Sequence, residues 1–292
     1  MNLLLPIMGG LAQGMILFLA ASGLTLVFGV MGVLNFAHGG FFALGAFVIY
    51  SLAGGESLPA WQFLALCVVG AAAVGVIGMV FEVIVFRRIY HLPHLDALLA
   101  TYAVLLVVTG GITQVWGVAS LGQPMPSEFR TALRFGGAIV PVYDIVLIVI
   151  GVLVAVGLWF LLERTRFGRS VRAISADRQM SASLGINVGL VYTLMLGLGL
   201  GLAGLGGALV SPLLQIDAGL AAVFVIQSFA VVIVGGLGSI SGALVAALAL
   251  GLLNSLLVTV NPALAGFSLY IGMTAVLLVR PQGLFGRPVD RP

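Results

Sequence analysis

The sequence predicts an all-α membrane protein, a polytopic bundle of about nine transmembrane helices with re-entrant or broken Gly-rich segments. Of its 292 residues, 61% are hydrophobic and 7% are charged, whereas about a quarter of the residues in a soluble domain are charged. Long stretches contain no Asp, Glu, Lys or Arg at all: residues 1–55, 57–81, 97–127, 179–216 and 218–279. Segments such as residues 145–162 are apolar on all sides, which favours helices over the alternating strands of a membrane barrel.

The spans follow from apolar runs separated by Gly, Pro and polar breaks, since a helix needs about 20 apolar residues to cross the hydrocarbon. In chain order they cover residues 10–30, 37–53, 61–86, 96–116, 139–162, 187–210, 220–237, 240–258 and 263–279. We treat residues 1–292 as a single membrane-spanning domain with a polar loop at 163–187.

The arginines predict the orientation. All twelve basic residues are Arg, and basic residues near span ends stay on the cytoplasmic side. Ten of them follow the third, fifth and last spans, and an even number of crossings separates these clusters; Arg130 and Arg134 fall on the other face. We therefore expect the N-terminus outside and the C-terminus in the cytoplasm. The net charge of +3 then reflects topology and does not indicate nucleic acid.

Glycine is expected to pack the helices closely, because small residues four apart let helix backbones approach in lipid. The chain has 41 glycines, and the pairs Gly197/Gly201 and Gly238/Gly242 have this spacing.

The polar loop at 163–187 holds five arginines, and residues 169–184 can form a short helix with Val171 and Ile174 on one side. Two interpretations stay open from the residues alone. The loop is either an ordinary basic loop that fixes topology, or a helix that docks into a cytoplasmic partner.

Polar residues near or within the spans have two interpretations each. Asn35 and His38 either cap helix ends, which we favour, or form a substrate or proton site. Gln227 and Asn254 either line a path for a polar solute or hydrogen-bond neighbouring helices. Glu82 is expected to form a surface ion pair with Arg87.

Two kinds of chemistry are not supported. His91 and His94 have a metal-like spacing, but no full ligand set accompanies them, so no metal site is expected. Ser239 and Ser241 lie in a Gly-rich turn without a neighbouring base or the frame of a nucleophile elbow, which argues against an intramembrane enzyme.

Four segments together resemble the branched-chain amino acid ABC permeases of the LivH type. They are residues 165–188, TRFGRSVRAISADRQMSASLGINV; residues 23–47, which contain NFAHGG; residues 229–253, which contain GGLGSISG; and residues 280–286, RPQGLFG. The resemblance covers essentially the whole chain, and the NFAHGG and RPQGLFG pieces are the most specific.

The resemblance implies a permease subunit in a bacterial inner membrane. Its partners would be a second homologous permease, two ABC ATPase subunits and an extracytoplasmic solute-binding protein, with ATP and Mg on the ATPases and no cofactor on this chain. The loop would couple this subunit to the ATPases through residues that we assign by position: Arg169, Arg172, Ala176, Asp177, Arg178, Ala182 and Gly185.

Independently of the resemblance, the chain contains no lysine, and a P-loop needs a Lys to reach the β- and γ-phosphates. The expected function is import of branched-chain amino acids or a related small polar solute. A stand-alone secondary transporter or channel is the alternative, and it would favour paired ionisable residues near the bilayer midplane.

Overall fold

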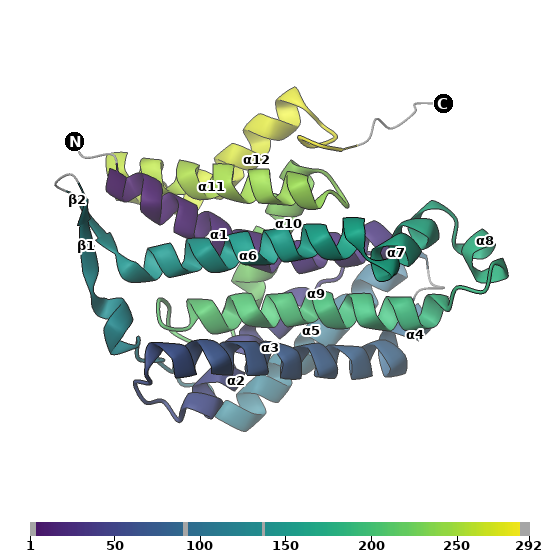
Figure 1. The fold of residues 1–292 in the computed structure, drawn as a ribbon, viewed down its shortest axis with the longest axis horizontal. Coiled ribbons are helices and arrows are strands. Elements are labelled where there is room, and N and C mark those ends of the chain that lie inside the picture. Colours follow the sequence, from purple (N-terminus) through teal and green to yellow (C-terminus); the bar gives the residue numbers. More distant parts are fainter. Residues whose placement is uncertain (1–3, 90–92, 136–137, 287–292) are drawn as a thin grey trace.

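The computed structural model describes residues 4–89, 93–135 and 138–286. In these ranges the chain folds into a helix bundle with two short strands (Figure 1). Seven helical segments are apolar and long enough to cross a bilayer. They are α1 (Leu4–Met31), α3 (Ala60–Phe81) continued by the π-helical turn η1 (Glu82–Phe86) and α4 (Arg87–Ile89), α5 (His94–Trp116), α6 (Val142–Arg164), α9 (Val188–Val210), α11 (Ile240–Val260), and the 3₁₀ turn η3 (Pro262–Phe267) continued by α12 (Ser268–Val279). The predicted fold class is confirmed.

Two further apolar helices are shorter. α2 (Ala37–Ala53) has 17 residues and α10 (Leu220–Gly235) has 16, so each is about 25 Å long and falls short of the roughly 30 Å hydrocarbon layer. Each adjoins a break with a glycine at positive φ, Gly32 before α2 and Gly236 after α10. These breaks correspond to the broken Gly-rich segments expected from the sequence, while the number of crossings stays a prediction.

The helix α1 forms the centre of the bundle. Every residue from 14 to 27 is buried, and α1 contacts α6, α9, α10 and α11. Its approach to α9 is so close that a Cβ atom on Gly23 would overlap the backbone of Gly199. Without a hydrophobic effect between helices in lipid, such close backbone packing is a main source of helix association.

The two ends of the bundle differ (Figure 1). The N-terminal end of α1 lies at the same end as the antiparallel hairpin of β1 (Ala132–Phe135) and β2 (Ala138–Pro141), which follows the 3₁₀ turn η2 (Ser127–Arg130). The opposite end carries α4, α7 (Arg166–Ala176) and α8 (Arg178–Ser183). The arginines of α4, α7 and α8 therefore lie at one end of the bundle, and Arg130 and Arg134 lie at the other.

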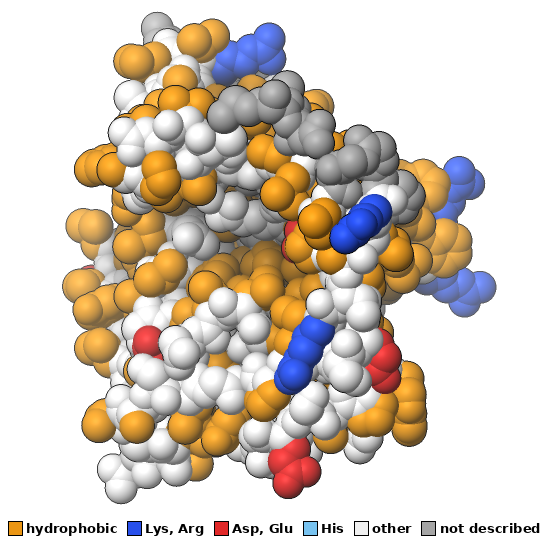
Figure 2. Space-filling model, turned by 90° about the vertical axis from the view of Figure 1, so that its left-hand side faces the viewer, with side chains coloured by type: hydrophobic (Ala, Val, Ile, Leu, Met, Phe, Trp, Pro, Cys, Tyr) orange, Lys and Arg blue, Asp and Glu red, His pale blue; other side chains and the backbone are white. Residues whose placement is uncertain are grey.

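The surface fits a lipid environment. Large apolar side chains are exposed along the outward faces of α3, α5 and α6, among them Val76, Leu106 and Val156. Figure 2 shows the hairpin end, where charged side chains are sparse and the face is hollowed near its centre, with hydrophobic side chains inside the hollow.

Candidate functional site

The segment between α6 and α9 forms two short helices. Thr165 has an extended backbone, and its Oγ1 accepts the Gly168 N–H at 3.1 Å, which starts α7. Asp177 ends α7 and starts α8, because its Oδ1 accepts the Met180 N–H at 2.9 Å. The single helix expected over residues 169–184 is therefore wrong: an Asp that caps a new helix interrupts it.

α7 lies against the bundle on one face only. Gly168, Val171 and Ile174 are buried, and their spacing of three places them along one side of the helix. Arg172 is on the outer side, where it pairs with Glu163 at 3.3 Å and donates to the Leu162 carbonyl. α7 is thus fixed to the end of α6 by both its apolar and its polar side.

α8 projects farther from the bundle than α7 (Figure 1). Its connection to α9 passes through Gly185 at φ +85° and Asn187, whose Oδ1 accepts the Leu190 N–H at 3.0 Å. The Arg178 guanidinium lies over the Tyr192 ring, 5.4 Å from its centroid, and ties α8 to the first turns of α9.

All the residues assigned to coupling by position are exposed: Arg169, Arg172, Ala176, Asp177, Arg178, Ala182 and Gly185. Two apolar side chains that the sequence analysis did not single out accompany them. Met180 of α8 is 58% exposed, and Leu184, the C-cap of α8, is 76% exposed. The Leu184 N–H donates to the Met180 carbonyl at 3.0 Å, so the two residues are one turn apart. Their spacing within an otherwise polar stretch was the signal that could have found them.

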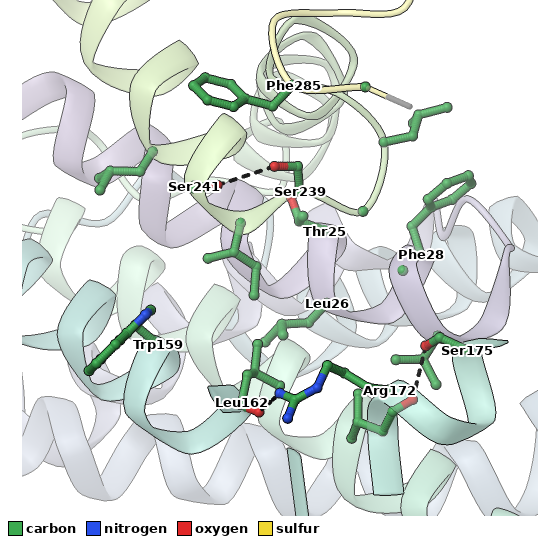
Figure 3. Close-up of a pocket in the computed structure, with 18 of the residues that line it drawn as sticks. Thr25, Leu26, Phe28, Trp159, Leu162, Arg172, Ser175, Ser239, Ser241 and Phe285 are labelled. Carbon is green, nitrogen blue, oxygen red and sulfur yellow. Dashed lines mark hydrogen bonds between the residues drawn. The ribbon is translucent and has the colours of Figure 1, made fainter. Parts of the chain in front are cut away.

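A cavity of about 970 Å³ opens between this segment and the turn that joins α10 to α11. Figure 3 shows Trp159, Leu162 and Arg172 on one side of the cavity, and Ser239, Ser241 and Phe285 on the other. Its walls are mostly apolar with a few hydroxyl and charged groups. Ser239 starts α11, since its Oγ accepts the Gly242 N–H at 3.1 Å, which gives this serine a structural role.

The break between α1 and α2 contains one buried polar residue, Asn35. Asn35 lies one residue before Phe36, the N-cap of α2, and its Oδ1 accepts the Ala37 N–H at 3.0 Å. Asn35 therefore satisfies the first N–H of α2, although it does not occupy the N-cap position itself. His38 does not cap: it lies inside α2, and its Nε2 donates to the Ala20 carbonyl of α1 at 2.5 Å. The capping interpretation of His38 is therefore wrong, because its ring bridges two helices. The Asn35 Nδ2 and His38 Nδ1 atoms are buried without a hydrogen-bond partner in the described part of the chain.

Glu82 is also placed differently from the expectation of a surface ion pair. Its side chain is fully buried in the π-helical turn, while Arg87 is 46% exposed. Arg87 Nε lies 3.2 Å from both carboxylate oxygens. The Thr193 hydroxyl of α9 donates to Glu82 Oε2 at 2.5 Å, and Arg87 Nη2 donates to the same hydroxyl oxygen at 2.9 Å. The three side chains form one network that joins α3 to α9.

The remaining polar candidates lie apart from one another. Asn254 Nδ2 donates to Gln13 Oε1 at 2.7 Å, and Ser268 Oγ donates to Asn254 Oδ1 at 2.6 Å. Asn254 thus links α11 to α1 and α12. This supports the interpretation that Asn254 hydrogen-bonds neighbouring helices over the interpretation that it lines a solute path. Gln227 is half-buried on α10, and both of its interpretations stay open.

The paired glycines lie at helix contacts. A Cβ atom on Gly197 would come within 2.5 Å of the Met79 side chain, and one on Gly201 within 3.2 Å of the Ala71 carbonyl oxygen. Both positions lie where α9 packs on α3.

The second pair of glycines lies at the start of α11. Gly238 has φ +82°, and a Cβ atom there would lie 3.2 Å from the Gly29 Cα. A Cβ atom on Gly242 would overlap the Gly235 carbonyl oxygen, so neither of these two positions has room for a side chain.

No group of three or more potential metal ligands occurs within the described ranges. The side chains of His91 and His94 lie outside the described residues.

Comparisons with known proteins agree on one family. The family described as "Branched-chain amino acid transport system / permease component" matches residues 7–278. The chain is 28% identical to the high-affinity branched-chain amino acid transport system permease protein LivH of Escherichia coli, over 96% of this chain and 94% of that protein. It is 27% identical to BraD, the corresponding permease protein of Pseudomonas aeruginosa, over 97% and 95%.

A third relative is the probable branched-chain amino acid transport permease protein LivH of Methanocaldococcus jannaschii, at 29% identity over 95% of this chain and 91% of that protein. No solved structure shows a significant match to the chain. Since the family matches nearly the whole chain, this protein belongs to the permease components of the branched-chain amino acid transport systems.

Proposed function

We propose that this chain is the permease subunit of an ABC importer, which moves branched-chain amino acids or a related small polar solute across the inner membrane by alternating access. The observation that carries the proposal is the α7–α8 segment. In a bundle whose long helices expose mainly apolar side chains, it is a capped, exposed two-helix projection at the arginine-rich end. The relatives are transport permeases by name, and a projection of this kind offers a rigid surface for a cytoplasmic partner.

The partners follow from what the chain lacks and from its family. It has no lysine and therefore no P-loop of its own, so ATP and Mg would bind to two partner ATPases. A second homologous permease would complete the membrane unit, and an extracytoplasmic binding protein would deliver the solute. The chain would be oriented with its N-terminus outside and its C-terminus in the cytoplasm, which places α7 and α8 on the ATPase side.

Alternating access needs a contact that differs in free energy between two states. Docking of α8 onto an ATPase supplies such a contact, since the ATPases move relative to each other as they bind and hydrolyse ATP. The buried faces of α7 fix the segment to α6, so a displacement of α8 would be passed on to the bundle.

The test is reconstitution of the chain with its second permease, both ATPases and the binding protein in liposomes. We expect ATP hydrolysis that is stimulated by the loaded binding protein, and uptake that requires ATP. A chain that carries solute in the absence of the ATPases would support a stand-alone transporter and overturn the proposal.

A further inference from the structure

The Glu82 network is unusual for a membrane helix. The Glu82 carboxyl group is buried completely at the point where α3 changes from α-helical to π-helical hydrogen bonding. π-helical turns are rare and occur frequently at functional sites. Ionisable residues inside membrane segments are costly and tend to be functional.

Burial of an ion pair alone does not account for the network. Removing the Glu82 carboxylate from water costs free energy that its attraction to the half-exposed Arg87 offsets only in part, so the pair is weak support for a purely stabilising role. What the pair does provide is directional contact. Arg87 and Glu82 belong to the same end of α3, and both hydrogen-bond Thr193 of α9.

Thr193 lies just beyond the α7–α8 segment in the chain. α9 begins at Val188, immediately after the connection from α8. In its first turns, the Tyr192 ring contacts the Arg178 guanidinium of α8. The next residue, Thr193, hydrogen-bonds with Glu82 and Arg87. A continuous series of contacts therefore runs from α8 through the first turns of α9 to the end of α3.

We propose that Glu82, Arg87 and Thr193 are positioning residues that force α3 to move with the first turns of α9 when the α7–α8 segment is displaced. The inference rests on the proposed function and assigns the path by which the displacement enters the bundle. The packing of α9 on α3 at Gly197 and Gly201 depends on close fit alone, because no hydrophobic effect drives helices together in lipid. A charged group that is hydrogen-bonded from both helices fixes their register.

The experiment compares variants that keep the shape of the network and remove its polar contacts. Thr193→Val removes the hydroxyl, and Glu82→Gln removes the charge. Thr193→Ser keeps the hydroxyl and serves as the conservative variant. Thr259→Val is the matched control, since the Thr259 hydroxyl donates at 2.8 Å to the Ser255 carbonyl of its own helix. Each variant is reconstituted with its partners, and three quantities are measured: association with the ATPases, the rate of ATP hydrolysis, and the amount of solute taken up per ATP hydrolysed.

We expect Thr193→Val and Glu82→Gln to bind the ATPases and hydrolyse ATP, while solute uptake per ATP falls by about 2- to 30-fold, the range seen for changes along coupled networks. Thr193→Ser and Thr259→Val should keep the wild-type ratio. The double variant should lose little more than either single one, since both break the same contact. A merely structural role would lower the yield of complex and leave this ratio unchanged.

An unchanged ratio in variants that assemble normally would overturn the inference and leave the proposed function intact. Failure of both Thr193→Val and Glu82→Gln to assemble would assign the network to folding and would overturn it as well. If the wild-type chain itself neither binds ATPases nor supports ATP-driven uptake, the proposed function and the inference fail together.

Discussion

The exposed apolar tip of α8 leads to the most quantitative prediction. Met180 and Leu184 are 58% and 76% exposed in the isolated chain, although they lie at the end of the bundle that carries most of the arginines. If α8 docks on an ATPase, these two side chains become buried. Replacing them by Ala removes most of that apolar contact and preserves the helix, because Ala is the best helix former.

The magnitude follows from the exposed fractions. Fully burying a Leu or Met side chain stabilises by about 1.5–3 kcal/mol, and docking can bury only the fraction that is now exposed. Each truncation should therefore weaken association by about 1–2 kcal/mol, which corresponds to roughly 5- to 30-fold in Kd. Met180→Ala combined with Leu184→Ala should lose about 2–4 kcal/mol if the two effects add.

The assay is titration of the ATPase subunits onto the permease pair in lipid nanodiscs, with Kd measured for each variant. Leu133→Ala is the control, because Leu133 is 45% exposed and lies at the opposite end of the bundle. Ala182→Trp tests the same surface in the other direction, since a bulky side chain at an exposed position of α8 should obstruct docking and leave membrane insertion intact.

Unchanged Kd in the double variant and in Ala182→Trp, together with wild-type uptake, would refute the reasoning. The α7–α8 segment would then be only a basic loop that fixes the topology of the chain in the membrane. If the double variant weakens ATPase binding by the same factor as Leu133→Ala does, the weakening reflects general instability of the chain. That result would also contradict a docking role.

Two further predictions concern orientation and the α1–α2 break. For the orientation, a single Cys is placed at exposed Gln179 or at exposed Ala132 in a Cys67→Ala background. The Cys at position 179 should react with an impermeant thiol reagent only after the cells are permeabilised, whereas the Cys at position 132 should react once the outer barrier is open. Labelling of position 179 from outside would show that the orientation is the reverse of the predicted one. Asn35→Ala should cost about 1 kcal/mol of stability, a typical capping loss, and His38→Ala about 2–5 kcal/mol, as for other large buried side chains, both followed by thermal unfolding in detergent. Retained stability with a selective loss of transport would assign these residues to the solute path instead.

The sequence predicts the helices well and the polar contacts poorly. Spans are recognisable because a helix in lipid must be apolar over its whole length, and a helix of the structure lies at each expected span. The boundaries are less accurate: α1 begins at Leu4 and not at residue 10, residues 139–141 of the fifth expected span belong to β2, and residues 263–267 of the last one form the 3₁₀ turn η3. The sequence analysis does not predict the hairpin of β1 and β2, since β1 lies in the region left between the expected spans 96–116 and 139–162 and β2 overlaps the start of the latter. Its strands are four residues each, too short for an alternating pattern to stand out.

The roles of the polar residues depend on which helices become neighbours, which is not a local property. Glu82 and Arg87 are five apart, and that spacing suggested a surface pair. Burial of Glu82 follows from the packing of α9 on α3, which brings Thr193 from 111 positions away in sequence. His38 likewise looked like a cap because of the break before it, whereas its partner is Ala20 of α1. In contrast, the contact of Asn35 with the first N–H of α2 is local and agrees with the expected cap, except that the N-cap position is Phe36.

The central claim, that ATP energy enters this subunit through α8, is tested most directly by site-specific cross-linking in the assembled complex. A photoactivatable maleimide is attached to Ala182→Cys or Ala132→Cys in the Cys67→Ala background, the native thiol being buried in any case. The account predicts an adduct between position 182 and an ATPase subunit, with a yield that changes when ATP hydrolysis is trapped, and no such adduct from position 132. If position 182 never joins an ATPase subunit in a complex that transports solute, the claim is wrong.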